Sequence, residues 1–229
     1  MHSLKWQSSS IVILSAASIF SLSAFAQGSG IANTDAVRRV RGNTVYSNEA
    51  PKVQMSIAKG FRFVGTQHIN LYGVAEAEQF IFVKGERGGA VKSFYWLQFE
   101  HFLPSNDRTY NYGSLSPLQL GDLQFNSDVK SWADLTAALK EDQASDAAAA
   151  ARLLAKQGLS FPRKAVLVHM FHVPSADHRA EFMILYGEAL PEDSTVPVGK
   201  QGVLLDKEAP DKARIFLDRA REGLKVRTR

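Results

Sequence analysis

The sequence predicts an α+β fold, in which an antiparallel sheet of about five or six strands carries helices packed on one face. Segments in which apolar and polar residues alternate with period two are grouped together along the chain. Helical periodicity is confined to two stretches, residues 131–158 and 210–224. Because strands do not alternate with helices, we expect three or four strands, one helix or two, two further strands, and a final helix.

The first segment, residues 1–26, predicts a secretory signal peptide. Lys5 supplies positive charge before the largely apolar stretch 11–25, and Ala24-Phe25-Ala26 offers small residues for cleavage after Ala26. A membrane-spanning helix needs about 20 mainly apolar residues, and this stretch is shorter and interrupted by serines. We therefore expect a secreted or periplasmic protein that has no transmembrane span once the leader is removed.

The composition predicts one domain that folds without covalent cross-links. The 229 residues include no cysteine, so the hydrophobic core alone must stabilise the fold. We expect a single α+β domain over residues 51–229. It follows a flexible N-terminal segment, residues 27–50, which is polar and contains glycine.

The charge of the chain is mildly positive. Lysine and arginine exceed aspartate and glutamate by 27 to 23, a net charge of +4. We predict no nucleic-acid partner, because such a partner requires basic residues concentrated on one face. The nearest approach to such a concentration is the C-terminal run of Arg219, Arg221, Lys225, Arg227 and Arg229. We interpret this run as a solvated helix face and tail, with contact to anionic lipid head groups or an anionic polymer as the alternative.

The first strands are predicted from residue 51 onward. Residues 53–57 and 61–71 alternate between apolar and polar side chains. Residues 78–85 and 91–103 are expected to form a hairpin, because the glycines of the intervening "ERGG" supply the positive φ angles of a tight turn. Residues 104–127 are rich in Asn, Asp, Ser, Gly and Pro, and predict a long loop of the kind that is often functional.

The helical stretch 131–158 begins with Ser131 as a capping residue, and Ser145 offers a second cap inside it. The sequence therefore allows one helix or two. Residues 165–173 and 180–190 predict a second pair of strands. Pro210 then opens the C-terminal helix, because proline suits the first turn.

A group of histidines raises the question of a metal site. His169, Met170, His172 and His178 lie within ten positions. On a regular strand, residues three apart point to opposite faces, so His169 and His172 cannot bind one ion. We predict no metal and no cofactor. A group of His172, His178 and Glu181 at the mouth of the hairpin is the alternative.

The stretch from Val91 to Leu103 carries aromatic side chains on both parities. This pattern is typical of a central strand that is covered on both faces. Helices provide one cover. The second cover is the N-terminal segment, the long loop, a partner subunit or a ligand, because a large apolar patch rarely faces water.

This aromatic sheet face and the loop that follows it lead to the predicted function, the binding of a small amphipathic molecule or an envelope protein. Amphipathic aromatic side chains suit a ligand that has both apolar and polar parts. The candidate ligand-binding residues are Tyr72, Tyr95, Trp96, Gln98, Glu100, Arg108 and Tyr110. The alternative is that the aromatic residues only fill the core, where each contributes about 1.5–3 kcal/mol.

Two other functions remain open at this point. The chain has no cysteine nucleophile, G-x-S-x-G, H-E-x-x-H, P-loop or G-x-G-x-x-G motif. A hydrolase or metal-dependent enzyme built on dispersed His, Glu and Asp residues is still an alternative, because such sites are defined by geometry. The other alternative is an accessory structural protein that completes its sheet against a partner, for which a homodimer is one arrangement.

Overall fold

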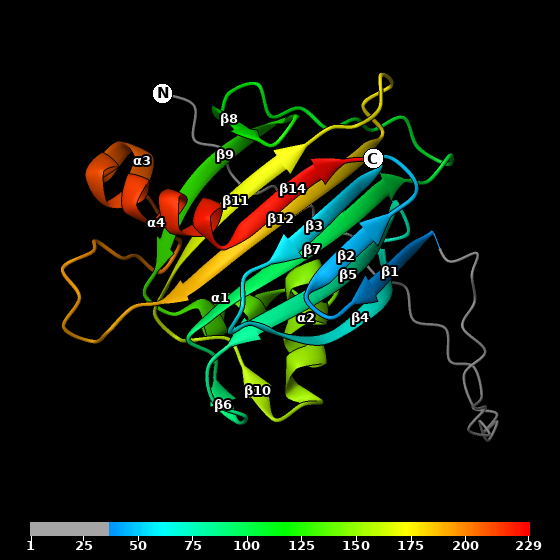
Figure 1. Ribbon diagram of the computed structural model, residues 1–229. Helices are drawn as coiled ribbons and strands as arrows, with labels where there is room; N and C mark the ends of the chain where they lie inside the picture. The colour runs from blue at the N-terminus through cyan, green and yellow to red at the C-terminus, as the bar shows by residue number, and fades with distance from the viewer. Residues whose placement is uncertain (1–36) are drawn as a thin grey trace, which may run out of the picture. The chain divides into compact units, whose positions relative to one another are not determined.

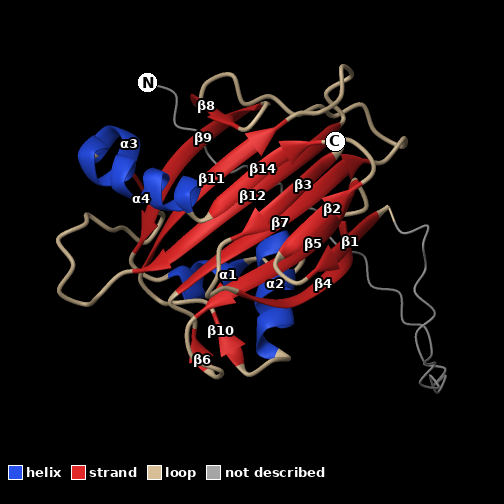
Figure 2. Ribbon diagram, viewed as in Figure 1, coloured by secondary structure: helices blue, strands red, loops and turns tan. Residues whose placement is uncertain are grey.

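The structure is a computed structural model that describes residues 37–229. Within this part of the chain it contains fourteen strands and four helices, and strands dominate the view in Figure 2. The predicted α+β class with five or six strands is therefore wrong: the protein is mostly β, with antiparallel sheets of eight and four strands. The predicted leader, its cleavage position after Ala26 and residues 27–36 lie outside the described residues.

The eight-stranded sheet is antiparallel throughout, and its order is β13-β9-β11-β12-β7-β5-β4, with β8 paired to β9. Residues 91–103 are extended as predicted, and they form the central strand β7. The strands of this sheet are β4 (Arg62–Leu71), β5 (Ala75–Lys84), β7 (Ser93–Phe102), β8 (Ser116–Leu120), β9 (Leu123–Trp132), β11 (Ala165–His172), β12 (Ala180–Ala189) and β13 (Val203–Leu204).

A four-stranded sheet covers one face of the larger sheet, as Figure 1 shows. Its order is β1-β2-β3-β14, and its strands are β1 (Arg38–Arg41), β2 (Thr44–Ser47), β3 (Val53–Ile57) and β14 (Leu224–Thr228). Val45, Met55 and Val226 project inward and join Phe82 and Leu97 in one hydrophobic core. The N-terminal strands are therefore one of the two covers that the aromatic strand requires.

Helices lie on both faces of the eight-stranded sheet, whereas the sequence predicted one face. Helices α3 (Leu205–Glu208) and α4 (Pro210–Glu222) contribute side chains to the same hydrophobic core as the four-stranded sheet. Helices α1 (Leu135–Glu141) and α2 (Asp146–Ala155) cover the opposite face, where Leu154 packs with Ile81 and Trp96. A small parallel pair, β6 (Gly89–Ala90) and β10 (Leu159–Ser160), lies beside this second core.

The predicted break in the first helical stretch is confirmed. Ser145 caps α2, because its side chain accepts a hydrogen bond from the backbone N–H of Ala148. The first cap differs from the prediction. Asp134 accepts from Ala137 N–H and begins α1, while Ser131 belongs to β9.

The strands that the sequence analysis missed explain why the predicted class failed. β1 and β2 form a hairpin at Gly42, whose φ is 57°, inside the segment that was predicted to be flexible. β8 and β9 form another at Gly121, whose φ is 58°, inside the predicted loop. β14 lies in the predicted basic tail. Two of these pairings are local hairpins, whereas β14 becomes a strand by pairing with the distant β3.

Two further predictions concern disulfide bonds and membrane-spanning helices. The chain has no cysteine, so the fold is held without disulfides, as predicted. Between residues 37 and 229, no helix combines the length and the apolar character that a bilayer span requires.

Candidate functional site

The seven predicted ligand-binding residues separate into three groups. Trp96, Gln98, Glu100 and Tyr110 come together on the α2 side of the sheet. Tyr95 projects from the opposite face of β7 into the other core. Tyr72 and Arg108 are exposed at the surface, where the Tyr72 hydroxyl donates to Asp142. Both faces of β7 therefore need to be considered.

On the α2 side, two glutamates lie directly opposite each other. Glu100 on β7 pairs in register with Glu181 on β12. Residues 103–115 cross over them and supply two tyrosines. The Tyr110 hydroxyl donates to Glu100 Oε1 at 2.6 Å, and the Tyr112 hydroxyl donates to Glu181 Oε2.

A third carboxylate joins this group through an amide network. Gln98 Nε2 donates to Glu100 Oε2 at 2.7 Å and to Asp146 Oδ2 at 3.2 Å. Gln98 Oε1 accepts from Gln79 Nε2 at 2.9 Å and from Trp96 Nε1 at 3.1 Å. We call Glu100, Glu181 and Asp146 the acid cluster. Hydrogen bonds thus join β5, β7, α2 and the loop residue Tyr110 in one partly buried network, beside which Glu181 lies.

Burial controls the protonation of the acid cluster. It raises the pKa of Glu181 to about 8, and the neighbouring charge of Glu100 adds to the rise. Burial also raises the pKa of Glu100, against hydrogen bonds from Tyr110 and Gln98 that lower it, and the pKa of Asp146. Among the described residues, no lysine or arginine forms an ion pair with any of the three. Glu181 is therefore mostly protonated at neutral pH.

A row of stacked rings closes the acid cluster. Phe102 stacks on Tyr110 with 4.3 Å between ring centroids, and Tyr112 stacks on Phe171 at 4.2 Å. Only 4% of Glu181 and 8% of Tyr110 is exposed. Glu181 and Tyr110 are thus packed beneath the loop, whereas Glu100 and Asp146 are half-buried.

The alternative metal ligands are separated by their own contacts. His172 Nδ1 lies 2.8 Å from the carbonyl oxygen of Gln124, and His178 Nδ1 lies 3.3 Å from that of Tyr110. Glu181 is buried against Tyr112. Within residues 37–229, no group of three or more His, Cys, Asp or Glu side chains is arranged to hold a metal ion.

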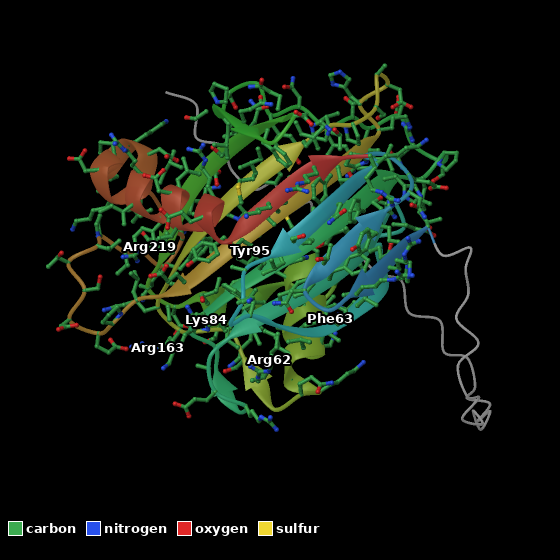
Figure 3. All side chains as sticks on the ribbon, viewed as in Figure 1. Arg62, Phe63, Lys84, Tyr95, Arg163 and Arg219 are labelled. Atoms are coloured by element: carbon green, nitrogen blue, oxygen red, sulfur yellow. The ribbon has the colours of Figure 1, made fainter. Side chains whose placement is uncertain are left out.

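An open cleft of about 720 Å³ lies at the other end of β7 and β12, on the opposite face of the sheet. Three aromatic residues line it: the half-buried Phe61, and behind it the buried rings of Tyr95 and Tyr186, of which 0% and 6% is exposed. The centroid of the Tyr95 ring is 5.0 Å from each of the other two. We call this the aromatic cleft. Figure 3 labels Tyr95 together with Lys84 and Arg219, two residues of its rim.

The rim of the aromatic cleft is cationic. Lys59, Lys84, Lys92 and Arg219 line it, against the carboxylates of Glu188 and Glu222. Arg219 is paired, because its Nη1 lies 2.5 Å from Glu188 Oε1. In the described part of the chain, the three lysines form no ion pair. The rim therefore keeps positive charge available.

Helix α4 fixes the position of the central ring. The Tyr95 hydroxyl donates to the carbonyl oxygen of Ala220 at 2.7 Å. Gly223 follows α4, and a Cβ atom there would lie 2.2 Å from this hydroxyl. Glycine is therefore needed at position 223 for the close approach of the helix end to Tyr95.

The sequence analysis identified Tyr95 but missed the rest of the aromatic cleft. Lys84 and Lys92 flank the predicted "ERGG" turn, so the hairpin already placed them at one end of the sheet. Tyr186 lies opposite Tyr95 only in the observed register of β7 and β12. That register is a tertiary feature, and no local pattern specifies it.

Comparisons of the chain with protein families, curated proteins and solved structures find no match. The geometry itself therefore defines the class: a β-rich protein with two layered sheets, one open cationic cleft and one closed acid cluster.

Proposed function

We propose that the protein binds a small amphipathic anion in the aromatic cleft. The observation that carries this proposal is the combination of an aromatic lining with a rim of lysines that form no ion pair within residues 37–229. The rings suit the apolar part of a ligand. The ammonium groups suit a carboxylate, sulfonate or phosphate, because hydrogen bonds between charged groups are the strongest available.

The size and rigidity of the cleft support the same function. Its volume of about 720 Å³ is in the range of small-molecule sites, about 300–1,000 Å³. Contacts with Ala220 and with the neighbouring rings hold Tyr95 in place. A preformed floor favours binding, because few side chains must be ordered when the ligand arrives.

Export is part of the proposal and rests on the predicted leader. A secreted or periplasmic protein of this kind would meet its ligand outside the cytoplasm. Amino-terminal sequencing of the mature protein checks this, and we expect the first residue to be Gln27. A chain that retains Met1 and stays in the cytoplasm would contradict export.

Binding has more support than the two other functions. The acid cluster brings three carboxylates together, but Tyr110 and Tyr112 are hydrogen-bonded to two of them and cover them. An accessory protein or a homodimer would need a surface contact, and the aromatic cleft is concave.

Calorimetric titration with dodecanoate and dodecanol tests the proposed function. We expect dodecanoate to bind more tightly, because only its head group pairs with the rim. The double variant Lys84→Gln/Lys92→Gln should lower the affinity for dodecanoate at least about tenfold, since hydrogen bonds between charged groups are lost.

The matched control is Lys156→Gln/Lys200→Gln, which removes the same charge from exposed positions outside the cleft. It should leave the affinity unchanged. Equal binding of dodecanoate and dodecanol, or equal losses in the two double variants, would refute the role of the rim.

A further inference from the structure

The outward face of the four-stranded sheet is basic. Residues on its strands alternate, so Val45, Met55 and Val226 enter the core while their neighbours project outward. The outward side chains include five cations. We call these cations and the polar residues between them the basic face. Four of these cations, Arg39, Arg41, Lys225 and Arg227, lie on the strands, and the fifth, Arg229, directly follows β14.

Strand register arranges these side chains in two rows across the sheet. Each row has a cation at both ends and two polar side chains between them. The rows are Arg39, Tyr46, Gln54 and Arg227, and Arg41, Thr44, Ser56 and Lys225. Three interstrand spacings separate the ends of a row, or about 14 Å at about 4.8 Å for each spacing. The positive charge is thus spread over the breadth of the sheet.

The described side chains include no carboxylate that neutralises the basic face. Within residues 37–229, none of its five cations forms an ion pair. No outward position of its four strands is acidic. Two acidic residues lie beside the ends of these strands: Glu49, in the turn after β2, and Asp122, which accepts a hydrogen bond from Thr228.

Tyr46 preorganises two of the arginines. The guanidinium carbons of Arg39 and Arg229 lie 5.4 Å and 5.7 Å from the centroid of its ring. Arg229 Nη1 also donates to Asn48 Oδ1 at 2.8 Å. Such cation–π contacts hold the charged groups at the surface without cancelling their charge.

A second, smaller cleft of about 340 Å³ adjoins this sheet at the edge strand β14. Arg221, Lys225 and Arg227 line it. Arg221 lies 3.9 Å from Asp218, which is a weak contact at an exposed position. The cleft therefore offers a recess for a single anionic group beside the basic face.

We infer that the basic face docks the protein on the surface of a bilayer that contains anionic lipids. The shape of the charge favours this partner over a linear polyanion, because the cations lie in two rows across a sheet and not along one groove. Tyrosine is typical of membrane–water interfaces. Each cation near such a surface strengthens binding about fivefold, so that five of them act together.

Co-sedimentation with vesicles tests the inference. We expect binding to vesicles made of equal parts phosphatidylglycerol and phosphatidylcholine at about 0.1 M salt, and none to phosphatidylcholine alone. The triple variant Arg41→Gln/Lys225→Gln/Arg227→Gln should bind about 100-fold more weakly. The single variant Lys225→Gln, expected to lose about fivefold, keeps the test valid if the triple variant does not fold.

The control is Lys156→Gln/Lys200→Gln/Lys207→Gln, which removes the same charge from exposed positions outside the four strands. It should retain most of the binding to anionic vesicles. Equal losses in the two triple variants would overturn the inference. So would tight binding to heparin without binding to anionic vesicles, which would assign the basic face to a polymer.

Discussion

Tyrosine–glutamate pairs lie at both ends of β7 and β12, and the two ends behave differently. In the aromatic cleft, the Tyr186 hydroxyl donates to Glu188, and Arg219 neutralises that carboxylate from the other side. In the acid cluster, the Tyr112 hydroxyl donates to Glu181, but no cation reaches the carboxylate. The same two residue types therefore line an open site at one end and a closed core at the other.

Charge compensation explains the difference. A carboxylate with an arginine partner can stay ionised at a hydrated rim. A carboxylate without a cation must be buried with its proton or leave the core, because burying a lone charge is costly. The cover that Tyr110 and Tyr112 form over the acid cluster and the protonation of Glu181 are therefore linked, because both follow from burial without a cation.

The largest expected effect comes from opening the closed end. Replacing Tyr110 by alanine removes a ring that is stacked on Phe102 and a hydrogen bond to Glu100. The free energy of unfolding should fall by about 3–5 kcal/mol, as for other buried aromatic residues. Urea denaturation measures it.

Tyr110→Phe is the matched control, because it keeps the ring and removes only the hydroxyl. It should cost about 1–3 kcal/mol. If Tyr110→Ala cost less than Tyr110→Phe, residues 103–115 would not be the cover of the acid cluster.

The second prediction concerns pH. The pKa of Glu181 is about 8 in the folded protein, above the ordinary value of 4.5. Between these two values the folded state binds more protons than the unfolded state, so stability decreases as pH rises. The loss from pH 5 to pH 8 should be on the order of 3 kcal/mol. Glu181→Gln should remove this part of the pH dependence and make the protein more stable than wild type at pH 8.

The open end gives the contrast to this pH dependence, because there the carboxylate of Glu188 is paired with Arg219. An unchanged slope in Glu181→Gln, measured by urea denaturation at each pH, would show that Glu181 is not the titrating group.

A smaller effect is expected at the floor of the aromatic cleft. In Gly223→Ala the added Cβ would lie 2.2 Å from the Tyr95 hydroxyl, so the ring or the end of α4 must move. We expect a loss of about 1–3 kcal/mol in thermal or urea unfolding, together with weaker binding of dodecanoate. Gly113→Ala, whose nearest contact is 3.4 Å away, should change neither. If Gly223→Ala bound dodecanoate with wild-type affinity, Tyr95 would not be part of the binding site.

Local sequence patterns correctly predicted the strands that are rich in apolar side chains. Residues 91–103 and the pair formed by residues 165–173 and 180–190 are rich in apolar side chains, and all three became long strands. Of the four-stranded sheet, only the strand at residues 53–57 was predicted, because the sheet joins residues 38–57 to residues 224–228, which are far apart in the sequence. Without that sheet, helices were the only regular elements predicted to cover the large sheet, and the α+β class followed.

The candidate sites show the same limit of prediction from local sequence patterns. Strand parity places Gln98 and Glu100 on one face, and the structure brings them together. The same parity separates them from Tyr95, although the predicted binding site included all three. Glu181 joins Glu100 only through the register of two strands, and Asp146 through the start of α2. Contacts of this kind depend on tertiary packing, which no local pattern records.

The most direct test of the account is a map of dodecanoate binding by amide chemical shifts. We predict saturable shifts at Lys84, Lys92 and Tyr186, and none at Glu100 or Glu181. Shifts centred on the acid cluster, or no saturable shifts anywhere, would contradict the assignment of binding to the cationic end and closure to the acidic end.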